Sequence, residues 1–204
     1  MPRPDFIYLA SQSPRRAQLL EQLGVRFDKL LPDATEDAEA LEAVHGREAP
    51  AGYVQRVTGL KLDAALARLA RSGLALAPVL CSDTTVAVGR DILGKPESAA
   101  QAAQMLAQLS GRTHRVLTAV ALAHGKRRWQ VLSTSTVRFE AMSPAQIRAY
   151  VATGEPMGKA GAYAVQGRAA MHIAHISGSY SGIMGLPLRE TAQLLLQAGF
   201  QFKG

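Results

Sequence analysis

Ser11-Gln12-Ser13-Pro14-Arg15-Arg16 lies between a short apolar run, residues 6–10, and a strongly helical stretch, residues 17–23. Ser13 is a favoured N-cap residue, and Pro14 fits the first helical position because its missing N–H would be unpaired there anyway. We therefore predict a strand, a turn and a helix start, with Gly24 just beyond the end of the helix. The free N–H groups of this helix start should face the point where the strand ends.

Two arginines stand in the first turn of this predicted helix, at the positive end of its dipole. Cations are electrostatically unfavourable there unless an anion joins them. Arg16 also continues the apolar stripe of Leu20 and Leu23, so it should project from the sheet-facing side of the helix. The pattern is typical of a phosphate site, but an ordinary capped helix with two solvated arginines fits this stretch equally well.

The composition indicates one soluble domain spanning residues 1–204, because a chain of this length that is 48% apolar can bury a proper core. It has no apolar run of about 18 residues and no signal-peptide pattern at its start, so we expect a cytoplasmic protein that does not bind membranes. The single cysteine, Cys81, agrees with a reducing compartment. The net charge of +7 fits anionic metabolites or merely a soluble surface, while scattered basic residues and one Trp argue against nucleic acid.

Hydrophobic periodicity and turn residues predict strands and helices that alternate irregularly along the chain. The expected strands are residues 6–10, 27–31, 79–88, 115–123, 129–139 and 170–176. The expected helices are residues 14–23, 50–72, 98–109, 143–153 and 188–198. This order favours a single α/β unit with a mixed sheet. The stretch from residue 154 to 187 is rich in glycine, which indicates backbone packed close to another group.

Asp83 stands in the middle of the clearest predicted strand, where an ionised carboxylate is costly unless it is paired or bound to a cation. Metal ligation or general-base chemistry would explain it, and so would a structural aspartate that accepts hydrogen bonds from loop N–H groups. Lys61 lies in the apolar stripe of the helix 50–72. Such a lysine usually extends its ammonium to the helix edge, but it can also reach toward an anion.

Five motifs, in this order, resemble those of the Maf nucleotide pyrophosphatases over nearly the whole chain. They are Leu9-Ala10-Ser11-Gln12-Ser13-Pro14-Arg15-Arg16, Ser82-Asp83-Thr84-Thr85-Val86, Gly94-Lys95-Pro96, Leu109-Ser110-Gly111-Arg112-Thr113-His114 and Lys159-Ala160-Gly161-Ala162-Tyr163-Ala164-Val165-Gln166-Gly167. The resemblance implies a fold similar to that of the inosine triphosphate pyrophosphatases, an α/β fold whose mixed twisted sheet is flanked by helices, with two lobes around an active-site cleft. It also implies a homodimer and a divalent cation, Mg²⁺ or Mn²⁺.

The implied reaction is water attack on the α-phosphorus of a nucleoside triphosphate, which releases pyrophosphate and the monophosphate. By resemblance, Asp83 accepts the proton of the water and binds the cation together with Glu36, although Asp33 or Asp37 fits the second position as well. The residues expected to neutralise the triphosphate are Ser13, Arg15, Arg16, Lys61 and Lys95. Gly158 departs from the aspartate that related sequences often carry before the lysine, which puts the local pairing of Lys159 in question.

Gln166 points to the family branch that acts on dTTP and UTP, and we expect modified pyrimidine analogues among the substrates. An amide offers one acceptor and donors, which match O4 and N3–H of uracil or thymine, whereas a carboxylate better matches the two donors of guanine. Arg15 and Thr84 also match positions associated with specificity. The alternatives are a 7-methyl-GTP pyrophosphatase with the same site and a nucleotide-binding regulator of septum formation. The joint presence of Asp83, Lys95 and Glu36 favours catalysis.

Overall fold

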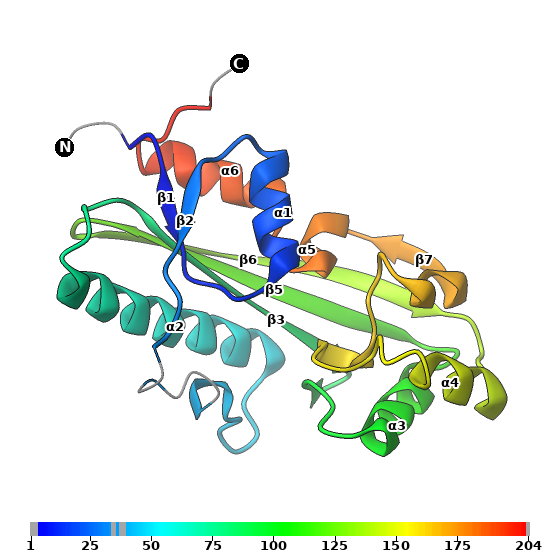
Figure 1. Ribbon diagram of the computed structural model, residues 1–204. Coiled ribbons are helices and arrows are strands. Elements are labelled where there is room, and N and C mark those ends of the chain that lie inside the picture. The colour runs from blue at the N-terminus through cyan, green and yellow to red at the C-terminus, as the bar shows by residue number, and fades with distance from the viewer. Residues whose placement is uncertain (1–3, 34–35, 37–39, 203–204) are drawn as a thin grey trace. The chain divides into compact units, whose positions relative to one another are not determined.

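The computed structural model describes residues 4–33, 36 and 40–202 (Figure 1). Its strands are β1 (Ile7–Leu9), β2 (Phe27–Lys29), β3 (Val79–Val88), β4 (Asp91–Leu93), β5 (Thr113–His124), β6 (Arg127–Phe139) and β7 (Ile173–Ser177). Its α-helices are α1 (Pro14–Gln22), α2 (Pro50–Ser72), α3 (Ala99–Leu109), α4 (Pro144–Val151), α5 (Tyr180–Met184) and α6 (Leu188–Gln197). Three short 3₁₀ helices are η1 (Ala40–Glu42), η2 (Ala160–Ala162) and η3 (Arg168–His172).

The strands form one seven-stranded sheet in the order β2-β1-β3-β5-β6-β7, with β4 paired to β3. The pairs of β1 with β2 and with β3 are parallel, whereas β4 on β3 and β7 on β6 are antiparallel. The predicted α/β fold with a mixed sheet and flanking helices is therefore confirmed. No helix within the described ranges is long and apolar enough to span a bilayer.

The chain divides into two compact units, and β3, β5 and β6 contribute residues to both. The first unit comprises Met1–Asp83, Thr118–Ser133 and Gly185–Gly204. The second comprises Thr84–Leu117 and Thr134–Met184. Asp83 is thus the last residue of one unit and its neighbour Thr84 the first of the other. The prediction of a single domain stays a prediction.

In the first unit, α2 covers one side of the strands, and α1 and α6 lie on the other side (Figure 1). Leu62, Ala65 and Leu69 of α2 pack in one buried cluster with Val79 and Cys81 of β3. Because side chains alternate along a strand, Asp83 shares the strand face of Val79 and Cys81, and so faces α2. The burial of Cys81 in this cluster raises its pKa to about 12, which suits a core residue and not a nucleophile.

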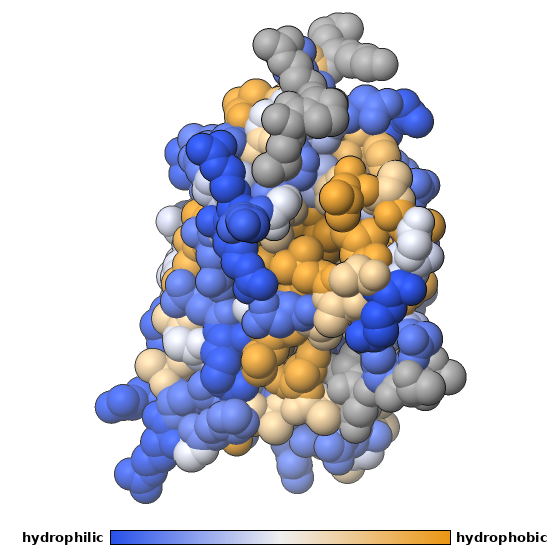
Figure 2. All heavy atoms as spheres, turned by 90° about the vertical axis from the view of Figure 1, so that its left-hand side faces the viewer, coloured by the Kyte–Doolittle hydropathy of each residue, from blue (hydrophilic) through white to orange (hydrophobic). Residues whose placement is uncertain are grey.

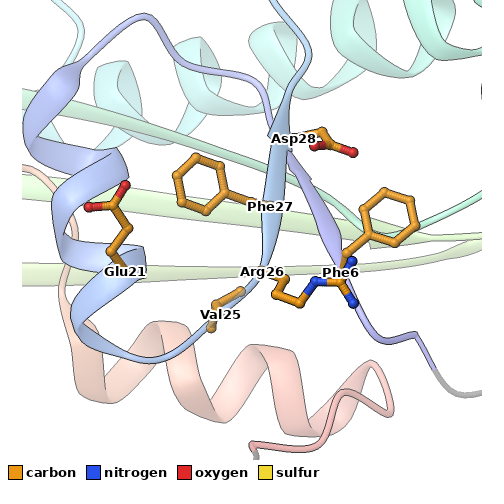
Figure 3. Close-up of a pocket in the computed structure, with 6 residues that line it drawn as sticks. All are labelled: Phe6, Glu21, Val25, Arg26, Phe27 and Asp28. Atoms are coloured by element: carbon orange, nitrogen blue, oxygen red, sulfur yellow. The ribbon is translucent and has the colours of Figure 1, made fainter.

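The surface of the first unit carries a pocket of about 320 Å³ beside β1 and β2 (Figure 3). The side chains that line it are Phe6, Glu21, Val25, Arg26, Phe27 and Asp28. None of these residues belongs to the predicted site. On the face shown in Figure 2, apolar side chains gather toward the middle and hydrophilic ones border them.

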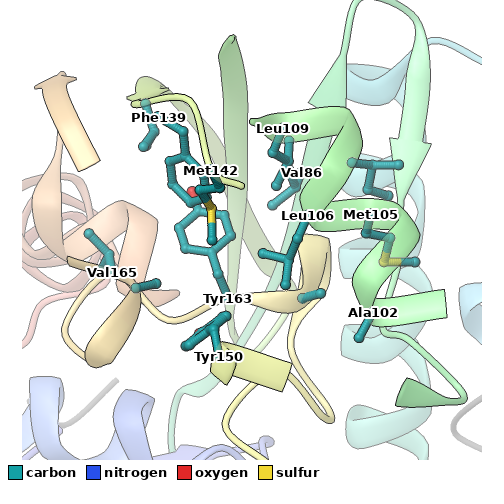
Figure 4. Close-up of a cluster of buried hydrophobic side chains, with 14 of the residues drawn as sticks. Val86, Ala102, Met105, Leu106, Leu109, Phe139, Met142, Tyr150, Tyr163 and Val165 are labelled. Atoms are coloured by element: carbon teal, nitrogen blue, oxygen red, sulfur yellow. The ribbon is translucent and has the colours of Figure 1, made fainter. Parts of the chain in front are cut away.

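In the second unit, α3 and α4 pack over a large buried cluster that includes side chains from β3, β5 and β6 (Figure 4). Leu106 and Leu109 of α3 meet Phe139 of β6 and Tyr163 of the glycine-rich segment there. A capping box starts α4: Ser143 Oγ accepts from Gln146 N, and the Gln146 side chain accepts from Ser143 N.

Three short elements differ from the prediction made from sequence. β4 and α5 were not expected, because strands of three residues and helices of five are too short to show a periodicity. The expected strand 170–176 begins only at Ile173, and η3 occupies the residues before it. The Glu155 carboxylate accepts from the backbone N–H groups of Arg168 and Ala169, which satisfies the first donors of η3 and favours the helical turn.

Candidate active site

The start of α1 has the predicted form, with Ser13 at the N-cap position and Pro14 in the first turn. The Ser13 side chain makes no capping hydrogen bond to the described residues. Instead, the hydroxyl of Ser11 accepts from Ser13 N at 3.2 Å and from Arg16 Nη1 at 3.1 Å. Sequence reasoning missed Ser11 because it precedes the cap by two residues and no helix rule gives that position a role.

Arg16 turns inward, as its place on the helix stripe predicted. Its Nε donates to the carbonyl of Gly185 at 2.9 Å, and the Ser82 hydroxyl donates to the same carbonyl at 2.9 Å. Burial lowers the pKa of Arg16, the charge of Asp83 opposes that effect, and neighbouring Arg15 adds to it. Burial also lowers the pKa of Arg15. Two guanidinium groups are thus partly desolvated at a helix N-terminus, where an anion would stabilise both.

Asp83 is paired with Lys61, the lysine singled out in the apolar stripe of α2. Lys61 Nζ lies 2.5 Å from Asp83 Oδ1 and 2.7 Å from Glu42 Oε1, so one ammonium group bridges two carboxylates. Asp83 is only 8% exposed, and a carboxylate so buried needs such a partner. Glu42 ends η1, which packs on α2, and its carbonyl accepts from the Tyr53 hydroxyl at 2.9 Å.

Glu36, the expected second acidic residue, is engaged elsewhere in the first unit. Its carboxylate accepts two hydrogen bonds from Arg68 of α2, at 2.9 Å and 2.5 Å, and lies 3.4 Å from Arg71. The hydrogen bonds from Arg68 lower the pKa of Glu36, with burial opposing them. The alternative at Asp37 lies outside the described residues. The acidic side chain that shares a partner with Asp83 is Glu42, which was not among the residues predicted for the site.

The carboxylates around Lys61 fit a divalent cation of the kind that the resemblance implies. Within residues 4–33, 36 and 40–202 no group of three or more acidic, His or Cys side chains makes a closed metal cage. Mg²⁺ needs no such cage, because it is usually bound by one or two carboxylates together with water and substrate phosphates. Asp83 and Glu42 supply two carboxylates that already face one positive charge.

The other expected residues, Thr84, Lys95 and Gln166, belong to the second unit. Thr84 is half-buried on β3, and Lys95 is exposed just after β4. Gly94, beside Lys95, accepts a hydrogen bond from Gly161 N at 3.1 Å. This bond ties the Gly94-Lys95-Pro96 turn to the segment that leads to Gln166.

The segment before Gln166 is tightly held. Gly161 has a φ of +68°, and a Cβ at this position would lie 2.8 Å from Val86 Cγ1, so only glycine fits. The Tyr163 hydroxyl lies 2.8 Å from Nε2 of buried His114. Lys159, whose pairing the absent aspartate at 158 had put in question, donates to the carbonyls of Glu155 and Met157.

Comparisons with known proteins agree on one family. The family model described as Maf-like protein matches residues 6–198. A protein of Polaromonas sp. named dTTP/UTP pyrophosphatase is 70% identical over 98% of this chain and 100% of its own length. A protein of Albidiferax ferrireducens with the same name is 70% identical over 97% of this chain and 98% of its own.

A solved nucleoside-triphosphatase, or dITP/XTP pyrophosphatase, from Mycobacterium abscessus is more distantly similar. It is 21% identical, with a TM-score of 0.41 over 65% of this chain and 73% of its own. A score this low does not by itself establish a common fold.

Proposed function

The chain belongs to the Maf-like protein family, and from this premise we propose that it hydrolyses dTTP and UTP to the nucleoside monophosphate and pyrophosphate. The curated relatives at 57–70% identity support this substrate class, because each is named dTTP/UTP pyrophosphatase. Their alignments cover nearly the whole of this chain and of each relative.

The observation that carries the proposal is the Lys61 ammonium held between Asp83 and Glu42, in the same unit as the arginine-bearing start of α1. A buried carboxylate held as an anion is suited to accept a proton from a water molecule. In the proposed reaction Asp83 accepts a proton from a water molecule while the oxygen of that water attacks the α-phosphorus. The bond between the α-phosphorus and the oxygen that bridges it to the β-phosphorus then breaks, and pyrophosphate leaves.

The cationic residues supply the charge that a triphosphate requires. Arg15 and Arg16 stand at the N-terminus of α1, where the helix N–H groups and the Ser13 hydroxyl also favour an anion. Lys61 and Lys95 add two ammonium groups, which act as point charges toward phosphate oxygens. The proposed role of all four is to stabilise the negative charge that increases in the transition state.

We assign the proposed Mg²⁺ or Mn²⁺ to Asp83 and to one further carboxylate. Glu36 has that role by resemblance, but its carboxylate would have to break its ion pair with Arg68 to bind the metal. Glu42 already shares the Lys61 ammonium with Asp83. When bound, the ion would supply Lewis-acid stabilisation of the phosphate oxygens. Measuring the Mn²⁺ affinity of Glu36→Gln and of Glu42→Gln identifies the second ligand. Only the variant that lacks the true ligand should bind Mn²⁺ more weakly than the wild type.

Gln166, Thr84 and Arg15 are the proposed determinants of specificity. The exposed Gln166 amide has the donor and the acceptor that N3–H and O4 of a uracil or thymine require. A site that reads a guanine needs two acceptors instead, which the 7-methyl-GTP alternative would have to find elsewhere. We also propose, from the resemblance, that two copies of the chain form a homodimer.

The test is pyrophosphate release measured across dTTP, UTP, CTP, GTP and 7-methyl-GTP with purified protein. Higher kcat/KM for dTTP and UTP than for the other three is the expected result. A preference for 7-methyl-GTP would move the chain to the other branch. Tight binding of nucleotides without release of pyrophosphate would instead support the regulator of septum formation.

A further inference from the structure

Glu155 sits in the loop after α4, and its carboxylate collects three hydrogen bonds from two parts of the second unit. The Tyr150 hydroxyl of α4 donates to Oε1 at 2.7 Å. The backbone N–H of Arg168 donates to Oε2 at 3.0 Å, and that of Ala169 approaches Oε1 at 3.5 Å. The carboxylate therefore joins the end of α4 to the start of η3, directly after Gln166 and Gly167.

The backbone at Gly167 is pressed against this carboxylate. A Cβ added there would lie 2.3 Å from Glu155 Oε1, closer than any real contact. The φ of Gly167 is −104°, a conformation that other residues adopt readily, so the glycine is not required by its own backbone angles. A side chain at this position would instead push the Glu155 carboxylate away from its place.

Gln166 is thus an exposed residue on a backbone that is held on both sides. The five residues before it are buried, and Tyr163 among them pairs with His114. After Gln166, the only side chain that ties residues 168 and 169 to α4 among the described hydrogen bonds is Glu155. Burial alone would raise the pKa of Glu155, but the bonds from Arg168 N and Tyr150 outweigh it and lower the pKa, so these bonds are charge-assisted.

We propose that Glu155 is a positioning residue for substrate specificity: by fixing the backbone after Gln166, it sets where the Gln166 amide meets the base of the nucleotide. The inference rests on the proposed function, in which Gln166 reads a uracil or thymine. If the amide is displaced by about 1 Å, its donor and acceptor no longer align with O4 and N3–H of the base. Displacements of this size cost on the order of a hundredfold in rate.

The experiment compares kcat/KM for dTTP with that for GTP in the wild type and in Glu155→Ala. We expect the ratio of the two values to fall by about tenfold or more, because the loss falls on the substrate whose base Gln166 reads. Glu155→Gln should restore part of the ratio: its amide oxygen still accepts from Arg168 N and its amide nitrogen can donate to the Tyr150 hydroxyl, but that nitrogen cannot accept from Ala169 N. An equal loss of kcat/KM for both nucleotides in Glu155→Ala would overturn the proposal, since it indicates only a smaller folded fraction.

Two further variants keep the test decisive. Ser143→Ala removes the α4 capping box in the same unit without touching this loop, so it should lower stability and leave the ratio unchanged. Gly167→Ala pushes the carboxylate aside while keeping its charge, and should lower the ratio even if Glu155→Ala fails to fold. An unchanged ratio in a folded Gly167→Ala protein would contradict the inference. A wild type without preference for dTTP and UTP would overturn the proposed function before any variant is made.

Discussion

Asp83 is a carboxylate with very little exposure to solvent, and the protein stabilises its charge with a lysine that also serves a second carboxylate. Such a shared ion pair is costly to break, because removal of one partner leaves an uncompensated charge in a poorly hydrated place. Lys61 therefore stabilises Asp83 in the absence of substrate. In the proposed reaction the same ammonium has a phosphate oxygen as a further partner.

Asp83→Asn should abolish pyrophosphate release while the fold survives. The substitution keeps the shape of the side chain but removes the charge that accepts the proton, and positioned bases contribute about 10² to 10⁴ in rate. Release is measured with dTTP, and folding by circular dichroism and thermal unfolding. Asp63→Asn is a suitable control, because Asp63 on α2 is an exposed carboxylate paired with Arg128. Near-normal turnover by folded Asp83→Asn would contradict the role of Asp83 and support a binding protein.

Arg16→Ala should lower kcat/KM for dTTP. The loss corresponds to transition-state stabilisation on the order of 2 to 4 kcal/mol, if the charge of Arg16 acts in the transition state. Its guanidinium is partly desolvated beside Asp83 and at the start of α1, so the charge acts in a weakly screened place. Steady-state kinetics provide the measurement. Arg26→Ala is the matched control, since Arg26 forms an exposed ion pair with Asp5. Equal kinetics in the two variants would place Arg16 outside the phosphate site.

Gln166→Glu should narrow or reverse the preference for dTTP and UTP over GTP. A carboxylate opposite O4 leaves two acceptors facing each other, and an unsatisfied polar group in a closed site is costly. The ratio of kcat/KM values for dTTP and GTP is the measurement. If the wild type prefers pyrimidines and Gln166→Glu changes nothing, the branch assignment stands, and Thr84, Arg15 or backbone groups become the candidates for reading the base.

At the scale of elements, the segment from η2 to η3 is built by close contacts and not by regular structure. Gly161 lies against Val86, Gly167 against Glu155, and Ala162 has a φ of +60°, which is uncommon outside glycine. Positive-φ residues cost free energy that the surrounding packing must supply. Here the packing is the aromatic group of His114, Phe139 and Tyr163, whose ring centroids lie 4.9–5.4 Å apart.

His114 should make this packing sensitive to acid. Burial lowers its pKa from 6.5 to about 4, so the folded protein holds it neutral while the unfolded chain protonates it below about pH 6.5. The unfolded state then binds more protons, and the free energy of unfolding falls as the pH drops from about 6.5 toward 4, by up to about 3 kcal/mol. Urea unfolding of the wild type and of His114→Phe between about pH 4 and 6.5 measures how the free energy of unfolding depends on pH. Parallel pH profiles in the two proteins would show that His114 is not the group responsible.

At the scale of the whole chain, the elements that the sequence predicts well are those with local signals at both ends. The helix α2 begins at Pro50 and ends at Ser72 as expected, because Pro favours the first turn and Gly73 adopts a left-handed φ of +67°. The predicted strand 79–88 matches β3 residue for residue. These signals lie within a few residues of the boundary they specify.

The arrangement of the site depends on partners far apart in the sequence, and these were not predictable. Glu42 meets Lys61 across 19 positions, and Arg68 holds Glu36 across 32. Nothing in the sequence between β2 and α2 distinguishes Glu36 from Glu42, since both lie in a stretch without periodicity. Residue type and resemblance predicted which side chains form the site, and only the fold showed how Lys61, Glu42 and Asp83 are paired.

Removal of divalent metal should stop hydrolysis without unfolding the protein. The triphosphate brings negative charge that Lys61 and the arginines offset only in part, so the proposed Mg²⁺ or Mn²⁺ is needed for turnover. The fold does not depend on it in the same way, because the Lys61 ammonium already forms ion pairs with the carboxylates of both Asp83 and Glu42. We expect EDTA to abolish pyrophosphate release, excess Mn²⁺ to restore it, and the melting temperature to change by no more than about 2 °C, less than the shift for a stability loss of about 1 kcal/mol. Persistent activity in EDTA would contradict the proposed cation, and unfolding in EDTA would mean that Lys61 alone does not stabilise the acidic pair.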